Sequence, residues 1–178
     1  MKKLVLTLSG GMDSSVLLYL AQDRGYDHIH TLTFDYGQRH KRELECVQKQ
    51  IDNFNETYNG RVTNKVLDVK YIKDIAPTSS LTNKDIDNPK ISEMAGDAQP
   101  VSYVPFRNMM FLSICASYAE GIDADAVWYG AAEVDSLAGY WDGSKEFVDT
   151  INKVTDLNRE KRITIEAPLL NMSKAAIV

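Results

Sequence analysis

The architecture of this chain follows from one N-terminal segment, Leu4-Val5-Leu6-Thr7-Leu8-Ser9-Gly10-Gly11-Met12-Asp13-Ser14-Ser15-Val16. Its first half is an apolar run typical of a strand that is buried on both faces. Apolar residues at helical spacing follow directly, at Val16, Leu17, Leu20 and Ala21. The segment therefore predicts a buried strand, a glycine turn and a helix, in that order, and Gly25 is suited to end that helix as its C′ residue.

The predicted turn has the properties of a phosphate site. Its two glycines allow a ligand close to the backbone amides, and the first turn of a helix leaves N–H groups unpaired. Asp13 is a candidate for holding the magnesium ion that accompanies a nucleotide. The alternative is an ordinary strand-to-helix turn in which Asp13 or Ser14 is the N-cap and no ligand binds. Further hydroxyl donors are supplied by Ser9, Ser14 and Ser15.

Strands and helices alternate through the rest of the chain. Strands are predicted at about 29–34, 65–69, 126–130 and 162–167, and helices from about 41 into the fifties, at 105–121 and at 145–157. This alternation predicts an α/β fold with a doubly wound, parallel five-stranded sheet of the Rossmann-like kind. Ligands in such sheets bind at the carboxyl ends of the strands, near the switch in strand order.

Two polar loops carry the remaining candidates. Residues 77–100 lack an apolar pattern, and we expect them to form a mobile loop near the site. A second loop, expected from 130 to 142, holds carboxylates suited to the N–H donors of a guanine-type edge. Arg107 comes at a predicted helix start beginning with Pro105, where its charge opposes the helix dipole, so it is expected to face an anion.

Composition limits the class of protein. The chain has 178 residues, 44% of them hydrophobic, and a net charge of −5, as expected for one globular domain. The acidic balance argues against a partner nucleic acid. No apolar run approaches the about 18 residues of a membrane span, and a signal peptide is not recognisable, so we expect a cytoplasmic protein.

Cysteines and the C-terminal segment add two expectations. Cys46 and Cys115 lie in helical patterns and are expected to be reduced and packed. The last residues, 174–178, begin a predicted helix that is too short to be stable alone. Residues 1–178 are therefore expected to form one domain that is cut short in its last helix, unless the native gene is unusually short.

The turn resembles the signature of a known group. Ser9-Gly10-Gly11-Met12-Asp13-Ser14 is similar to the loop of the pyrophosphate-loop ATPases, and it lacks the Gly-Lys-Ser/Thr of a Walker A loop. The resemblance implies a fold of the adenine nucleotide alpha hydrolase type. It also implies that ATP is split between its α- and β-phosphates and that the attacking group is typically a carboxylate or amide oxygen.

Further segments narrow the resemblance to the family of 7-cyano-7-deazaguanine synthases. They are Thr-Phe-Asp-Tyr-Gly-Gln-Arg-His at 33–40, Val-Leu-Asp-Val at 66–69, Ser-Ser-Leu-Thr at 79–82, Val-Pro-x-Arg-Asn at 104–108, Tyr-x-Asp at 140–142, and Pro168 with Ser173-Lys174. The resemblance implies that 7-carboxy-7-deazaguanine, ammonia and ATP with Mg²⁺ give the nitrile, in a homodimeric enzyme.

The resemblance also implies site roles. Catalysis is expected to depend on Asp13, Arg107 and Lys174. ATP is expected to contact Leu8, Ser9, Gly10, Gly11, Met12, Asp13, Ser14, Ser15, Val16 and Phe34. The acid is expected to contact Tyr36, Gln38, Arg39, Asn108, Glu133, Asp135, Tyr140 and Asp142.

The chain departs from the family pattern at several positions. Phe106 replaces a glycine, Trp141 replaces a proline, and the C-terminal cysteines that bind zinc in the family are absent, so zinc is not expected here. Two alternatives stay open: a related enzyme that adenylates another carboxylate or amide, and a non-catalytic nucleotide-binding partner subunit. A tRNA thiolase is disfavoured by the acidic charge and by the lack of paired active-site cysteines.

Overall fold

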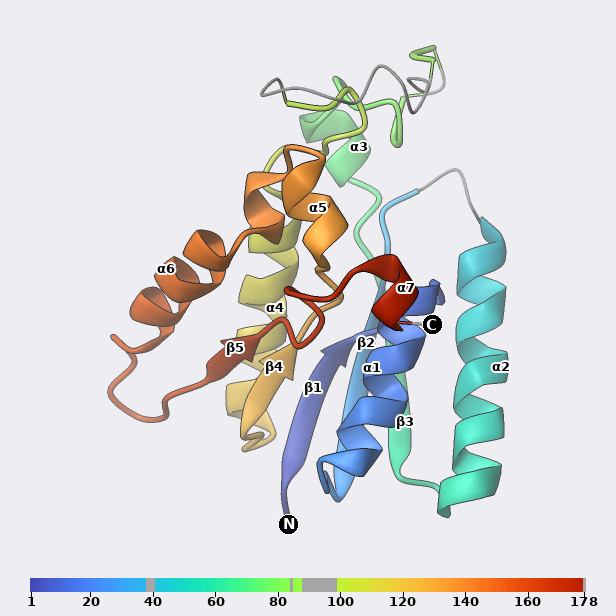
Figure 1. Ribbon diagram of the computed structural model, residues 1–178, viewed down its shortest axis with the longest axis vertical. Helices are drawn as coiled ribbons and strands as arrows, with labels where there is room; N and C mark the ends of the chain where they lie inside the picture. Colours follow the sequence, from blue (N-terminus) through green and yellow to red (C-terminus); the bar gives the residue numbers. More distant parts are fainter. Residues whose placement is uncertain (38–40, 84, 88–98, 178) are drawn as a thin grey trace.

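A parallel sheet of five strands, in the order β3-β2-β1-β4-β5, forms the centre of the molecule (Figure 1). The structure is a computed structural model that describes residues 1–37, 41–83, 85–87 and 99–177, with residues 41–43 described by their backbone alone. The strands are β1 Lys3–Thr7, β2 His28–Asp35, β3 Val62–Asp68, β4 Ala126–Trp128 and β5 Thr164–Glu166. The predicted α/β fold with a five-stranded parallel sheet is confirmed.

Helices cover both faces of this sheet. Their bounds are α1 Met12–Asp23, α2 Lys41–Tyr58, α3 Ile72–Ile75, α4 Arg107–Gly121, α5 Glu133–Leu137, the 3₁₀ helix η2 Trp141–Gly143, α6 Lys145–Thr155 and α7 Lys174–Ile177. In Figure 1, α1 and α2 lie on one face of the sheet, and α7 lies over the beginning of α1. Strand β1 contacts both α1 and α4.

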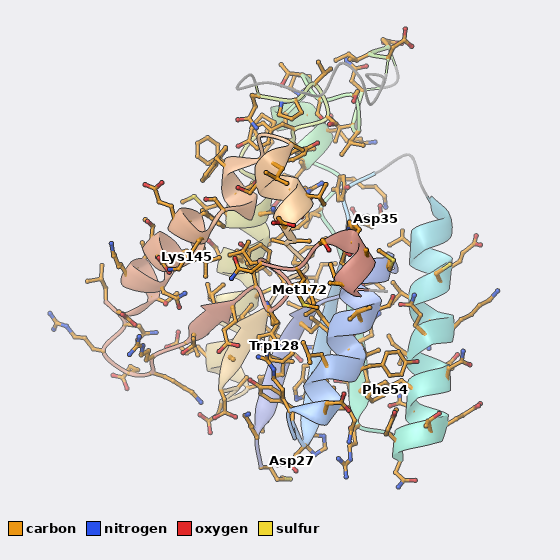
Figure 2. All side chains as sticks on the ribbon, viewed as in Figure 1. Asp27, Asp35, Phe54, Trp128, Lys145 and Met172 are labelled. Carbon is orange, nitrogen blue, oxygen red and sulfur yellow. The ribbon has the colours of Figure 1, made fainter. Side chains whose placement is uncertain are left out.

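The hydrophobic core is divided in two by the sheet. Successive side chains of a strand point to opposite faces, so that Leu4 and Leu6 belong to one core and Val5 to the other. Trp128 and Phe54 fill the first core, where Figure 2 shows Phe54 between α1 and α2. Because β1 is buried on both faces, its sequence is an unbroken apolar run, which is the pattern that predicted it.

Helix α1 is terminated by a glycine, Gly25, as its sequence predicts. Gly25 has a φ of +73°, a region open to glycine at little cost, and its N–H donates to Gln22 O while Tyr26 N–H donates to Ala21 O. These two bonds are those of a Schellman cap, so the predicted end of α1 is confirmed.

The structure differs from the predictions at several places, of which four bear on the site or the core. Helix α4 begins at Arg107, and Pro105 precedes it. The loop expected from 130 to 142 contains α5 and η2. Cys115 is buried as expected, but Cys46 is exposed, because it lies on the outward side of α2. In the 77–100 segment, Ser79 and Ser80 are fully buried and Ser79 Oγ donates to Ser102 O at 3.0 Å, so this part is packed.

The loops that form the candidate site lie at the carboxyl ends of the strands. In Figure 2, Asp35 marks this end of the sheet and Asp27 marks the opposite end. The strand order switches at β1, because β2 and β3 lie on one side of it and β4 and β5 on the other. A ligand site is expected there. Within the described residues, no helix combines the length and apolarity needed to span a membrane.

Candidate functional site

A cavity of about 380 Å³ opens at the switch point between β1 and β4. One wall is the turn after β1, and another is the turn after β4. The remaining walls come from the end of β2, the first turn of α4 and the segment from α5 to η2. Predicted site residues that line it are Leu8, Ser9, Gly11, Met12, Asp13, Ser14, Phe34, Tyr36, Arg107, Asn108, Asp135, Tyr140 and Asp142.

The turn after β1 is shaped by its serines. Ser14 is buried, and its hydroxyl donates to Gly11 O at 3.0 Å and accepts from Ser9 N–H at 3.2 Å. Gly10 adopts a φ of +85°, which explains a glycine there. Gly11 is the N-cap of α1 and offers no side chain, so the alternative in which Asp13 or Ser14 caps the helix is wrong. The N–H groups at the start of this 12-residue helix are therefore left for a ligand.

Asp13 has one oxygen engaged and one without a protein partner. Its Oδ2 accepts a hydrogen bond from Lys174 Nζ on α7, which lies over the beginning of α1 (Figure 1). Its Oδ1 is buried and has no hydrogen-bond partner among the described residues. A buried carboxylate oxygen without a donor is costly, and a divalent cation would satisfy it. This observation fits the Mg²⁺ that accompanies ATP.

The far side of the cavity combines a cation with aromatic rings. Arg107 Nη1 donates to Tyr36 Oη at 3.3 Å, and its guanidinium lies 5.6 Å from the Tyr36 ring centroid. The rings of Phe34 and Phe111 stack with centroids 4.0 Å apart and an interplanar angle of 3°. This side of the cavity therefore offers a flat apolar surface and a positive charge, which suits a planar anion.

Two carboxyl groups line the cavity on the α5–η2 segment. Burial raises the pKa of both Asp135 and Asp142, and in Asp142 the nearby Arg107 charge works in the opposite direction. Asp135 Oδ2 accepts the N–H of Ala132 at 2.8 Å, which fixes the start of α5. A Cβ at Gly143 would lie 2.7 Å from the Asp135 Cβ, so glycine there permits η2 to close onto α5.

The structure does not bring every predicted residue to the cavity. Glu133 is exposed on α5 and is not among the lining residues. The Ser15 hydroxyl donates to Gly11 O within its own helix, and Val16 packs into a core. Gly10 and Lys174 lie beside the cavity without lining it, and Lys174 reaches it through Asp13. Gln38 and Arg39 lie outside the described residues.

Sequence reasoning missed several lining residues. Ser102 and Tyr129 line the cavity, and the Tyr129 hydroxyl donates to Asp142 O at 3.3 Å. Gly130 lies against the turn after β1, since a Cβ there would be 3.5 Å from Ser14 N. A signal existed for Tyr129 and Gly130, because they directly follow a predicted strand next to the switch point. Leu81 lies in the Ser-Ser-Leu-Thr segment that carries the family resemblance, whereas Ser102 gave no signal, since it comes from a loop whose path the pattern does not predict.

Replacement of Asp142 by asparagine is expected to stabilise the fold while impairing catalysis. Asp142 is 3% exposed, and its raised pKa means that the folded state binds its proton more tightly than the unfolded state does. The free energy of unfolding of the wild type therefore falls as the pH rises through the pKa that Asp142 has in the folded state. Asparagine does not titrate, so the variant keeps this stability. At neutral pH the melting temperature should rise by roughly 2–4 °C.

The pH dependence provides the control for Asp142→Asn. Below the ordinary aspartate pKa of about 3.9, both folded and unfolded wild type are protonated at this position, so the difference in melting temperature should vanish. Calorimetric scans of both chains over a pH series test this. A variant that is less stable than wild type at neutral pH would contradict the stated effect of burial.

The described residues do not fit a structural zinc site. They contain no group of three or more His, Cys, Asp or Glu side chains that could hold a metal ion. Cys46 is exposed on α2 and Cys115 is buried in α4, so the two thiols do not share a site.

Comparison with known proteins identifies relatives over nearly the whole chain. The family model described as queuosine biosynthesis protein QueC matches residues 3–178. The chain is 39% identical over 181 residues to a 7-cyano-7-deazaguanine synthase of Clostridium kluyveri, covering 98% of this chain and 76% of that protein. It is 38% identical over 179 residues to the enzyme of the same name from Oceanobacillus iheyensis, covering 99% and 76%.

Solved structures with a similar fold are more distant in sequence. The U34-tRNA thiolase NcsA of Methanococcus maripaludis superposes with a TM-score of 0.57 at 18% identity, covering 99% of this chain and 54% of the thiolase. The NH₃-dependent NAD synthetase of Campylobacter jejuni gives a TM-score of 0.51 at 19% identity, covering 78% of this chain and 51% of the synthetase. At these identities the likeness supports the fold alone.

Proposed function

Because this chain belongs to the queuosine biosynthesis protein QueC family, we propose that it converts 7-carboxy-7-deazaguanine and ammonia to 7-cyano-7-deazaguanine with hydrolysis of ATP. This makes it an ATP-dependent ligase that forms a carbon–nitrogen bond. The observation that carries the proposal is one cavity in which a phosphate-type turn faces an Arg107 guanidinium and aromatic rings.

The chemistry explains why one cavity must hold two ligands. A carboxylate is a poor electrophile, so its oxygen attacks the α-phosphate of ATP and releases pyrophosphate, giving an acyl-adenylate. Ammonia displaces AMP and gives the amide. The amide oxygen attacks the α-phosphate of a second ATP and releases pyrophosphate, and loss of the two amide N–H protons and of AMP leaves the nitrile. Both activations need the acid held in line with the same phosphate, so alignment is the main task of the protein.

The turn after β1 supplies the nucleotide half of the site. Backbone N–H groups at the start of α1 and the hydroxyls around Ser9 and Ser14 bind phosphate oxygens. Asp13 Oδ1 would hold Mg²⁺, and the ion would supply positive charge to neutralise the phosphates. Lys174, now paired with Asp13, supplies a further positive charge beside the departing pyrophosphate.

The opposite half binds the acid. Tyr36 or Tyr140, which both line the cavity, stacks on the flat heterocycle, and Arg107 pairs with its carboxylate. The carboxyl groups of Asp135 and Asp142 accept hydrogen bonds from the N–H and amino groups of the deazaguanine edge. Burial excludes water from Asp142, which strengthens such a bond.

Product analysis by mass spectrometry tests the proposed function. The purified chain is incubated with ATP, Mg²⁺, ammonium and 7-carboxy-7-deazaguanine, and the expected product is the nitrile, with two ATP consumed per nitrile formed. Formation of AMP and an amide from a different acid would instead favour a related enzyme with another substrate. ATP binding without turnover of any acid would favour a nucleotide-binding partner subunit. Size-exclusion chromatography in the same preparation tests the homodimer.

A further inference from the structure

One tyrosine hydroxyl joins the two walls of the acid-binding half. Tyr103 Oη accepts the backbone N–H of Phe106 at 2.9 Å and the indole N–H of Trp141 at 2.8 Å. Phe106 directly precedes Arg107 on α4, and Trp141 directly precedes Asp142 on η2. A single oxygen therefore holds the residues that come immediately before Arg107 and Asp142, two of the charged groups of this half of the cavity, although Tyr103 itself is not among the lining residues.

The backbone at Phe106 requires such support. Phe106 has a φ of +53° and a ψ of +20°, a left-handed conformation that is strained for a residue other than glycine. It is the N-cap of α4, and its side chain makes no capping hydrogen bond. The bond from its N–H to Tyr103 and the contact of its ring with Trp141, at 5.5 Å between centroids, hold this conformation. The direction in which Arg107 leaves the helix start depends on it.

Neighbouring contacts join the same two segments. Ser102 Oγ and Tyr140 Oη lie 2.5 Å apart, and both residues line the cavity. The Trp141 ring packs edge-on against Phe147 of α6 at 5.2 Å, which anchors η2 to a helix of the main fold. The segment before α4 is thus joined to η2 and to the residue before it by several contacts, and two of the hydrogen bonds meet at the Tyr103 hydroxyl.

We propose that Tyr103 is a positioning residue that sets the separation of Arg107 and Asp142 through its hydrogen bonds with Phe106 and Trp141, and thereby sets the affinity for the acid. The proposal rests on the proposed function for the identity of that acid. Among the described residues, the hydrogen bonds of the Tyr103 hydroxyl go to Phe106 and Trp141 and not to the turn after β1, so ATP affinity should be independent of it.

Steady-state kinetics of Tyr103→Phe test this role. The variant keeps the ring and removes the hydroxyl, and the KM for the acid should rise about five- to tenfold while the KM for ATP changes by less than about twofold. Trp141→Phe removes the indole donor and keeps an aromatic ring between Phe106 and Phe147, and it should give a smaller rise because the bond from Phe106 N–H to Tyr103 remains. Because both substitutions remove the same bond, the double variant should be less impaired than the product of the single effects.

The matched control is Tyr118→Phe, which removes a hydroxyl from the other end of α4, where the ring packs on His30. It should leave both KM values unchanged. Equal rises in the two KM values for Tyr103→Phe, or additive effects in the double variant, would overturn the positioning role and indicate a general loss of structure.

A readout without substrate separates this proposal from the proposed function. The indole N–H of Trp141 gives its own NMR signal, and Tyr103→Phe should accelerate its exchange with solvent while the signal of Trp128, the other tryptophan, stays unchanged. A wild-type chain that makes no nitrile would contradict the proposed function alone. An unchanged Trp141 signal in Tyr103→Phe would contradict the positioning role whatever the substrate proves to be.

Discussion

Replacement of Asp13 by alanine is expected to lower kcat by about 10³-fold and to leave the fold intact. Asp13 Oδ1 is a buried acceptor without a partner among the described residues, at the place where the phosphate turn would bring Mg²⁺. The variant loses that ligand and leaves Lys174 without the carboxylate that it now contacts. Pyrophosphate release under saturating ATP measures the effect, and circular dichroism checks that the variant is folded.

The matched control is Asp23→Asn at the opposite end of α1. Asp23 is the last residue of the helix, where a negative charge is unfavourable to the dipole, so its loss should change neither turnover nor, by more than about 0.5 kcal/mol, the free energy of unfolding. Normal turnover of Asp13→Ala would contradict two proposals: that Asp13 holds Mg²⁺ and that the turn after β1 binds phosphates.

Replacement of Arg107 by glutamine is expected to lower kcat/KM for the acid by about 10²-fold. Arg107 brings the positive charge of the far wall, contacts the Tyr36 hydroxyl and counteracts the effect of burial on Asp142. Without this charge the carboxylate form of Asp142 is less favoured, so the pKa of Asp142 rises further. The acid limb of the pH–activity profile should therefore move to higher pH, in addition to the loss of activity at the optimum.

Arg159→Gln provides the control for this substitution. Arg159 is exposed in the turn between α6 and β5, so its variant has the same change of net charge and should keep the wild-type profile. If the pH–activity profile of Arg107→Gln is lowered without moving along the pH axis, Arg107 binds the acid but has no influence on the pKa of Asp142.

The segment from β1 through α1 to β2 shows how much of the fold can be predicted from residues that are close together in the chain. The buried strand at Leu4 to Leu8, the glycine turn and the Schellman cap at Gly25 all depend on residues close together in the chain, and each was predicted correctly. Helix α5 was missed because it is one short turn whose start is set by Asp135 accepting the Ala132 N–H, and such a helix has no room for an apolar period.

The candidate site shows the same division. The residues on the turn after β1 and on the motif at 104–108 were identified from their types and spacing, and the structure brings them to one cavity. Glu133 and Asp135 looked equivalent as carboxylates in one loop, but the helical turn of α5 sends Glu133 to solvent and keeps Asp135 at the cavity. Spacing alone could not distinguish them, because the loop was not recognised as a helix.

Sequence by itself determined the layered α/β architecture and the glycine turn after β1, since buried strands, amphipathic helices and glycine caps are encoded by neighbouring residues. Only the tertiary structure decided which distant residues share the cavity. Phe106 and Trp141, two of the departures from the family pattern, contact each other across the site, and Lys174 reaches Asp13 from the other end of the chain. These contacts depend on the order of the strands and on the packing of short segments against the core, which are properties of the whole fold and leave no local pattern.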